Sequence, residues 1–230
     1  MGPVKSGQPT RADRARQTRR RMLDRARELF VTEGYAATTM ERIADEARVA
    51  VQTLYYTFQT KGQLLCEVVE VTAAGEEDPV HVAQRPWMQE MLTASSGQRV
   101  LALGVEHGTD IFERVAPLWP VVTAATADPR VEQYWRGVVA SRRVGQGRMV
   151  ARLDELGALR DGLGLDRATD LVVVLFGHDV FRSLVVEAGW SVPAYKAWLF
   201  PALVQQLLQR PRLAPTAFAD LSFGPLLVKT

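Results

Sequence analysis

Residues 39–65 read TMERIADEARVAVQTLYYTFQTKGQLL, and this stretch decides the fold. Apolar residues recur at helical spacing in two short runs, over residues 40–48 and 50–58. A third apolar run begins after Lys61. Two short helices joined by a turn of about three to four residues are typical of a helix-turn-helix unit. The spacing therefore predicts such a unit within this stretch.

Capping residues mark where these helices begin. Thr38 followed by Glu41 fits a capping box, in which the threonine caps the first short helix and the glutamate reaches back to its backbone. Thr60 can cap the helix that follows the unit. Ahead of the unit, one apolar stripe predicts a long helix from Arg11 that ends at Gly34. We therefore expect three helices in the first sixty residues.

The positive charge of the chain is concentrated at this end. Residues 1–61 carry 12 Lys and Arg against 7 Asp and Glu, whereas residues 62–230 carry 16 against 19. A basic end on a mildly acidic body indicates a polyanionic partner for that end alone. The basic segment Arg11–Arg21 can contact phosphates or a minor groove, although basic segments are also often merely solvated.

The second short helix has two chemically different faces at about 100° per residue. One arc is polar and aromatic and carries no carboxylate: Gln52, Thr53, Tyr56 and Thr57. The opposite arc is apolar: Val51, Leu54 and Phe58. Hydroxyl and amide groups can reach base edges in a major groove, whereas a merely solvated face more often carries Glu and Lys. Lys61, just beyond the helix, can reach a phosphate. The pattern therefore predicts a DNA-reading face.

The remaining sequence excludes several classes of protein. With 47% hydrophobic and 23% charged residues among 230, the chain has ordinary globular composition. Its one cysteine, Cys66, excludes an internal disulfide, and its three histidines are widely spaced. We find no catalytic or metal-ligand constellation, so we expect no cofactor and no enzymatic activity. No apolar run reaches roughly 18–20 residues and no secretory signal is present, so we expect a cytoplasmic protein without membrane contact.

The pattern divides the chain into four parts and predicts an all-α fold. We expect a flexible arm over residues 1–10, a helix-turn-helix domain over 11–60, a helical body over 61–210 and an irregular tail over 211–230. The helices expected in the body cover residues 87–93, 100–114, 131–156, 166–188 and 192–209.

The run over residues 166–188 is apolar on nearly all sides. Residues 171–176 within it would also suit a buried strand, but no second strand-like run exists to pair with it. A helix that is apolar on all sides must be buried on all sides. An outer helix achieves this burial against a second copy of the chain, so the run predicts a dimer interface.

The helix-turn-helix stretch carries a set of residues at characteristic spacings: Thr39, Ile43, Ala44, Ala47, Val49, Thr53, Leu54, Tyr55, Phe58, Lys61, Leu64 and Leu65. In these residues it resembles the DNA-binding domain of the TetR family of bacterial transcriptional regulators, over about residues 14–66. The stretch 187–193, with Tyr195, Trp198 and Leu199, more weakly resembles the join between the last two helices of many members.

The resemblance implies an all-α homodimer that binds a double-stranded DNA operator. Thr39 would contact a phosphate, and Tyr55 and Lys61 would contact the DNA backbone. The last two helices would form a four-helix interface with those of the partner, and the intervening helices would enclose a small-molecule pocket. The residues that would face the groove are Gln52, Thr53 and Tyr56.

Two positions depart from the family pattern. Members usually have glycine in the turn, where this chain has Arg48, and arginine costs on the order of 1 kcal/mol there if φ is positive. The alternative is that the Arg48 side chain makes an additional contact with a phosphate. Members usually cap the reading helix with Ser or Thr, whereas Ala50 leaves it uncapped at a cost of about 1 kcal/mol. Both departures predict a less rigid reading head.

No motif marks the pocket or the interface. Mid-chain aromatic residues and histidines are individually more common in a plain core, but together they can line an apolar pocket that has a few polar contacts. The candidate ligand-binding residues are Trp87, His107, Ile111, Phe112, Trp119, Trp135, Phe176 and His178. The candidate interface residues are Leu171, Val174, Phe181, Leu184, Val185, Trp198, Leu203 and Leu207.

Together these features predict a ligand-responsive dimeric regulator, a repressor that a small-molecule effector releases from a palindromic operator. The effector would bind the mid-chain helices and change the spacing of the two reading helices. The alternatives are a DNA-binding regulator without an effector, controlled by a protein partner or by its abundance, and a helical small-molecule carrier or enzyme.

Overall fold

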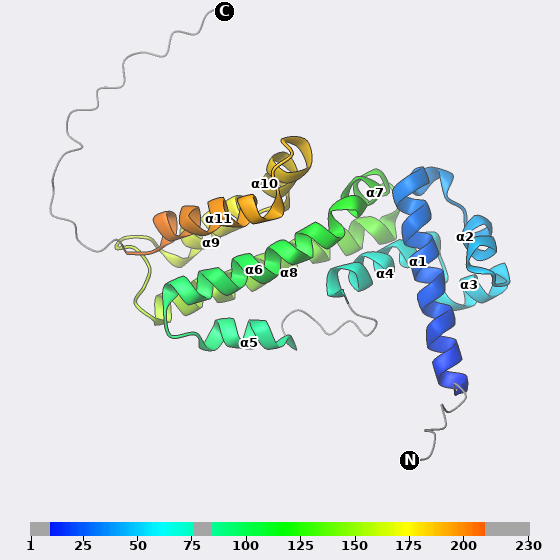
Figure 1. Cartoon of the computed structure of the whole chain (residues 1–230), viewed down its shortest axis with the longest axis horizontal. Coiled ribbons are helices and arrows are strands. Elements are labelled where there is room, and N and C mark those ends of the chain that lie inside the picture. The colour runs from blue at the N-terminus through cyan, green and yellow to red at the C-terminus, as the bar shows by residue number, and fades with distance from the viewer. Residues whose placement is uncertain (1–9, 76–83, 210–230) are drawn as a thin grey trace, which may run out of the picture.

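The computed structural model describes residues 10–75 and 84–209 (Figure 1). As the sequence predicts, the regular structure in these ranges is helical, apart from an isolated antiparallel bridge between Leu159 and Leu208. No helix in the two ranges has the length and apolar character that a membrane crossing requires. The predicted arm before Thr10, the predicted tail and His81 lie outside the described residues.

Four helices form the N-terminal head: α1 (Arg11–Ala37), α2 (Met40–Ala47), α3 (Val51–Phe58) and α4 (Lys61–Ala74). A capping box begins α1, because the Thr10 hydroxyl accepts a hydrogen bond from the Asp13 N–H while the Asp13 carboxylate accepts one from the Thr10 N–H. In Figure 1, α2 and α3 lie on the side of α1 that faces away from the rest of the chain. The predicted helix-turn-helix unit is therefore present and lies at one end of the molecule.

The body is built around two long helices that run side by side (Figure 1), α6 (Gly97–Val115) and α8 (Pro129–Glu155). A 3-10 turn, η2 (Ala116–Leu118), and the short helix α7 (Trp119–Ala124) connect them. Helix α5 (Pro86–Thr93) packs against α6. The last elements are α9 (Leu165–Leu175), α10 (His178–Phe181), the π-helical turn η3 (Arg182–Glu187) and α11 (Val192–Leu207).

The apolar core has two parts, and α7 belongs to the part that holds the head. Val121 and Val122 of α7 pack in one cluster with buried side chains of the head such as Phe30, Ile43 and Leu54. Full burial of such a side chain contributes about 1.5–3 kcal/mol. The second cluster joins α5, α6, the later part of α8 and the elements from α9 to α11. A movement of α7 therefore acts directly on the packing of the head.

The first helix does not end at Gly34. This glycine has φ 82° and ψ 168°, so it kinks α1, and helical structure resumes as far as Ala37. Glycine permits the positive φ because it has no Cβ atom. The prediction that Gly34 ends the helix is wrong by three residues, although the glycine does mark the break.

The cap of α2 is Thr39, and the predicted cap at Thr38 is wrong. The Thr39 hydroxyl accepts a hydrogen bond from the Arg42 N–H at 3.1 Å. Thr38 is fully buried, and its hydroxyl lies within hydrogen-bonding distance of the carbonyl oxygens of Leu29 and Gly34. The kink at Gly34 brings Thr38 against α1, which leaves the next threonine to cap the helix.

The predicted single helix over residues 166–188 is also wrong. Its first part ends at Phe176, whose ψ is 47°, and Gly177 precedes α10 in an extended conformation. A Cβ atom at residue 177 would lie 2.8 Å from the Val173 carbonyl oxygen, so only glycine fits there without a shift. The last helix, predicted over residues 192–209, is confirmed as α11.

Candidate nucleic-acid interface and ligand-binding region

Helix α3 presents a polar and aromatic face to solvent. Leu54 and Phe58 are at most 1% exposed and anchor the helix in the head. On the other side, Tyr56 is 91% exposed, and Gln52 and Thr53 are exposed as well. The helix sequence VQTLYYTF contains no carboxylate. A face of hydroxyl, amide and phenol groups without negative charge suits the major groove of a duplex.

The residues expected to contact the DNA backbone are also accessible. Tyr55 is 44% exposed beside the reading face. Thr39 is exposed at the N-terminus of α2, where free N–H groups can bind a phosphate oxygen. Their contacts with DNA stay predictions.

The turn between α2 and α3 is built on Arg48. This residue has φ 53° and ψ 51°, a left-handed conformation that residues other than glycine rarely adopt. The Val49 N–H donates to the Ala44 carbonyl at 3.0 Å, a bond typical of helix ends that glycine normally closes. The positive φ expected at Arg48 and the missing side-chain cap at Ala50 are both confirmed.

Replacing Arg48 with glycine is expected to stabilise the protein by about 0.5–1 kcal/mol, because glycine adopts this conformation without a Cβ penalty. The midpoint of thermal unfolding should rise by about 1–4 °C for a chain of this size. Circular dichroism melts provide the measurement, with Arg48→Ala as the control that removes the guanidinium but retains the Cβ atom. A midpoint for Arg48→Gly below that of Arg48→Ala would contradict the assigned turn. Equal loss of DNA affinity in both variants would support a phosphate contact by Arg48.

Lys61 braces the junction between α1 and α2. Its ammonium donates hydrogen bonds to the carbonyl oxygens of Tyr35 at 2.8 Å and Thr38 at 3.0 Å, and it lies 4.2 Å from the centre of the Tyr35 ring. The sequence does not reveal this structural role, because the two carbonyls lie 26 and 23 residues away along the chain. A lysine ammonium has three N–H groups, and these two hydrogen bonds leave the third for a phosphate. The predicted phosphate contact of Lys61 stays a prediction.

Replacing Lys61 with methionine is expected to lower the free energy of unfolding by about 1–3 kcal/mol, because two half-buried carbonyl groups lose their donor. Urea denaturation followed by circular dichroism measures the change. Arg27→Met is the matched control, since Arg27 is an exposed cation of α1 and its loss should change stability by no more than about 0.5 kcal/mol. If Lys61→Met has the same midpoint of urea denaturation as the wild type, the two hydrogen bonds of Lys61 contribute nothing to stability.

Two arginines of the basic segment contact residues outside α1, whereas Arg16 and Arg20 form ion pairs within that helix. Arg19 forms an ion pair with Glu67 of α4. Arg21 Nε donates to the Ala47 carbonyl at the end of α2 at 2.7 Å, so it helps to position the helix-turn-helix unit. Exposed ion pairs of this kind contribute little to stability. Contact between residues 11–21 and DNA stays a prediction.

Asp128, the cap of α8, ties the head to the body. Its carboxylate accepts hydrogen bonds from the Tyr35 hydroxyl at 2.8 Å and from the Arg130 N–H at 2.9 Å. Arg130 Nε in turn donates to Gln63 of α4 at 2.6 Å. Burial and the bond to Asp128 raise the pKa of Tyr35, so its hydroxyl stays protonated as a donor. The start of α8 is therefore coupled to both α1 and α4.

Three of the candidate pocket residues form one aromatic cluster between α7, α8 and α10. The centre of the Trp119 ring lies 4.1 Å from that of His178 and 4.9 Å from that of Trp135. Burial lowers the pKa of His178, and the nearby Arg142 and Arg182 lower it further, whereas Asp179 raises it. The consecutive helices α7 and α8 therefore meet α10, which is distant along the chain, at this cluster.

The other candidate pocket residues lie in two further groups. Phe112 contacts Phe176 in the core of the body, with ring centres 5.4 Å apart. Trp87 of α5 stacks on His107 of α6, with ring centres 5.0 Å apart. Ile111 is half-buried on α6. The seven candidates that carry a ring thus form three separate groups of ring contacts.

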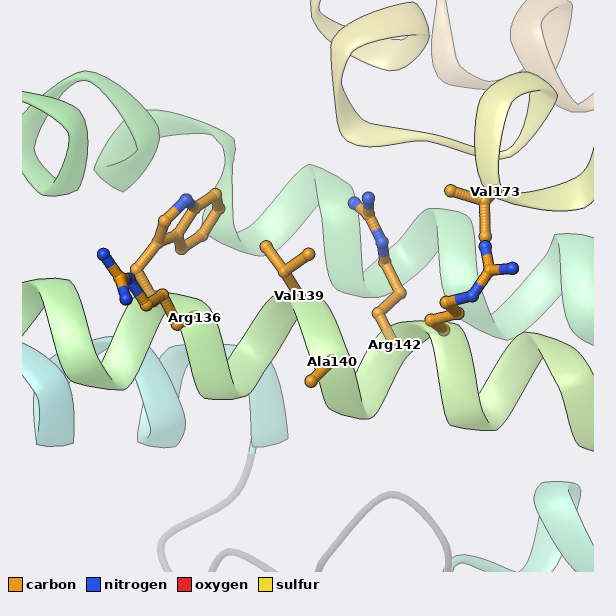
Figure 2. A pocket seen from close by; sticks show the side chains of 7 residues that line it. Arg136, Val139, Ala140, Arg142 and Val173 are labelled. Atoms are coloured by element: carbon orange, nitrogen blue, oxygen red, sulfur yellow. The ribbon is translucent and has the colours of Figure 1, made fainter. Parts of the chain in front are cut away.

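An open cleft of about 420 Å³ lies between α8 and α9 (Figure 2). Figure 2 shows Val139 and Arg142 pointing away from α8 toward the same side. Of the ligand-binding residues predicted from the sequence, Trp135 alone lines this cleft. The other lining residues were not predicted, because no motif distinguishes an arginine or valine that lines a cleft from one that is solvated. The full lining comprises Trp135, Arg136, Val139, Ala140, Arg142, Arg143 and Val173.

The predicted interface residues divide into accessible and buried sets. Val174 is 64% exposed, whereas Leu171, Leu184, Val185 and Trp198 are half-buried. Three of the predicted side chains are at most 1% exposed within one chain and therefore cannot reach a partner: Phe181, Leu203 and Leu207. For these three the predicted interface role is wrong, since α9, α10 and α11 fold onto α6 and α8 and bury them in the body core.

Two exposed apolar residues of the same region were missed by sequence reasoning. Val186 is 59% exposed on η3, and Trp190 is 37% exposed in the join that follows it. The ring of Trp190 packs edge-on against Trp198, with ring centres 6.3 Å apart. Together with Val174 they leave apolar surface uncovered on the last elements of the chain.

Known proteins share both the head and the whole fold. Residues 22–68 match the family model described as bacterial regulatory proteins, tetR family. The transcriptional regulator TcmR of Streptomyces glaucescens is 26% identical over 220 residues, which cover 94% of this chain and 91% of TcmR. A transcriptional regulator from Saccharomonospora viridis, solved in complex with choline, has a TM-score of 0.66 at 20% identity, covering 84% of this chain and 99% of its own. The SmeT–triclosan complex has a TM-score of 0.66 at 18% identity, covering 92% and 99%.

Proposed function

Because this chain belongs to the TetR family of bacterial regulatory proteins, we propose that it is a homodimeric repressor that binds a palindromic operator and leaves it when a small molecule binds. The exposed face of α3 carries the proposal. Gln52, Thr53 and Tyr56 can reach base edges, while Leu54 and Phe58 hold the helix in place from behind. An aromatic side chain that is 91% exposed has no role in the core of its own chain.

The uncovered apolar surface of the last elements supports a dimer. Val174 and Val186 are 64% and 59% exposed, and Trp190, which follows Val186 closely in sequence, is 37% exposed. Large apolar side chains exposed on these last elements are expected to be covered by another protein. A symmetric pair of heads would place two α3 helices at half-sites separated by about 34–36 Å or a multiple of it.

Helix α7 supports a response to a ligand. Its first residue, Trp119, belongs to the aromatic cluster with Trp135 and His178, while Val121 and Val122 pack in the core of the head. A ligand that separates these rings would shift α7 and the head together. A coupling of about 1–3 kcal/mol would change DNA affinity about 5–150-fold. Two proteins of similar fold were solved in complex with choline and with triclosan, and this supports a small-molecule ligand for the present chain.

Selection of DNA from fragmented genomic DNA tests the proposal. Purified full-length protein should enrich a small set of fragments that share an inverted repeat. The triple variant Gln52→Ala, Thr53→Ala, Tyr56→Ala should enrich none, although its unfolding should match the wild type because all three side chains are exposed. Failure of the wild type to enrich any fragment at low salt would contradict the proposed function.

A further inference from the structure

Arg142 is a half-buried cation on the open cleft, and it makes no hydrogen bond or ion pair within residues 10–75 and 84–209. The neighbouring arginines differ, since Arg136 pairs with Glu132 at 2.6 Å and Arg143 pairs with Asp170 at 2.8 Å. The N–H donors of Arg142 are therefore available to a ligand. A partly buried charge is costly unless an opposite charge compensates it.

The residues at the start of α10 do not neutralise this cation. The Asp179 carboxylate acts on Arg142 through space, but the Asp179 side chain is 82% exposed and contacts His178 Nδ1 at 3.3 Å. Arg142 is half-buried, and this burial lowers the pKa of its guanidinium. Since burial also lowers the pKa of His178, that imidazole is neutral at neutral pH. The cleft lining contains no carboxylate, and its Arg136 and Arg143 are paired, so the one arginine of the lining without an ion pair in the described residues is Arg142.

Apart from the paired Arg136 and Arg143, the other residues that line the cleft are apolar or aromatic. Val139 is 43% exposed and points to the same side of α8 as Arg142 (Figure 2). Trp135 lines the cleft and packs edge-on against Trp119. Trp119 is 8% exposed, and its indole Nε1 is buried without an acceptor in the described part of the chain. Buried indole N–H groups normally find an acceptor, so Trp119, which packs behind Trp135 and does not itself line the cleft, keeps a donor that is unsatisfied within the described residues.

From this arrangement we infer that the effector is an organic anion: a carboxylate or sulfonate group bound by Arg142, and an aromatic body that lies along Val139 and Trp135. The inference rests on the proposed function, because only a ligand-responsive regulator needs an effector. A cationic ligand would be repelled by the guanidinium, and an uncharged one would leave it unpaired.

Two fluorescent probes with the same aromatic rings test the charge. Anilinonaphthalene sulfonate carries the anion, whereas N-phenylnaphthylamine lacks it. Energy transfer from the tryptophans of the full-length protein measures the dissociation constant of each probe. The wild type should bind the sulfonate at least about tenfold more tightly than the uncharged probe, and Arg142→Gln should lose this preference without weakening the uncharged probe.

Matched variants separate a local charge effect from general damage. Arg142→Lys should retain part of the preference, and Arg148→Gln, which removes an exposed cation of the same helix, should retain all of it. Equal affinity of the wild type for both probes, or an equal loss of preference in Arg142→Gln and Arg148→Gln, would overturn the inference.

DNA binding, measured on the same proteins, separates this inference from the proposed function. Arg142→Gln should bind the selected operator as tightly as the wild type, because Arg142 lies on the body. If the operator is bound but the probe preference is absent, the inference alone fails. If the wild type binds no operator, the proposed function fails whatever the probes do.

Discussion

Operator affinity is expected to fall by about 100-fold or more in the double variant Val174→Glu, Val186→Glu, because a monomer has only one reading helix for the two half-sites. Both side chains are exposed in the single chain, at 64% and 59%, so the substitutions should leave the fold of the monomer intact. In a dimer they would bury charges without partners, which costs several kcal/mol for each ion. Sedimentation velocity should show a monomer at micromolar concentration, and fluorescence anisotropy should show weak operator binding.

Val144→Glu is the matched control for this variant. Val144 is 57% exposed on α8, so a new charge enters at a similar exposure on a helix outside the elements that carry the proposed interface. This control should remain dimeric and should bind the operator normally. A dimer of unchanged stability in the double variant would exclude the proposed interface.

Tyr56→Ala is expected to weaken operator binding by about 1–3 kcal/mol, or roughly 5–150-fold, through loss of its contact in the major groove. Since Tyr56 is 91% exposed, the free energy of unfolding should change little. Affinity for a scrambled duplex at low salt should be nearly unchanged, because phosphate contacts dominate non-specific binding. Wild-type affinity for the operator would remove Tyr56 from the reading face.

The head could be predicted from the sequence because its signals are local. Apolar spacing, the cap at Thr60 and the opposed faces of α3 all depend on residues within a few positions of one another, and the structure confirms them. The error at Thr38 has a tertiary cause. Two adjacent threonines offer the same capping chemistry, and only the packing of Thr38 against Leu29 and Gly34 decides between them.

The body was predictable as a set of helices, but its finer structure depends on long-range packing. The apolar run around Gly177 has a continuous helical pattern, although the backbone breaks there where it passes the Val173 carbonyl. The full burial of Leu203 and Leu207 follows from α11 folding onto other helices of its own chain. An apolar pattern alone does not distinguish burial within one chain from burial between two.

The candidate ligand site was the least predictable feature. The cluster of Trp119, Trp135 and His178 joins three helices, and no spacing in the sequence connects them. Arg142 is adjacent in sequence to Arg143, and both look equally solvated in a helical pattern. Only the fold shows that Arg143 pairs with Asp170 and that Arg142 does not.

The chain is well suited to a direct test of where α3 lies on DNA. Its one cysteine, Cys66, is 3% exposed, and burial raises the pKa of its thiol to about 11. Tyr56→Cys therefore provides a single reactive thiol to which a DNA-cleaving iron chelate can be attached. Asp154→Cys is the control, because Asp154 is exposed near the end of α8 that is distant from the head.

Cleavage of the selected operator by the chelate at residue 56 measures groove binding directly. We expect two clusters of cuts, symmetric about the centre of the operator and separated by about 10–10.5 base pairs or a multiple of this spacing. Asp154→Cys should give no cuts above background. Cleavage at residue 56 that does not exceed the Asp154→Cys control, while the operator is bound, would contradict the placement of α3 in the groove.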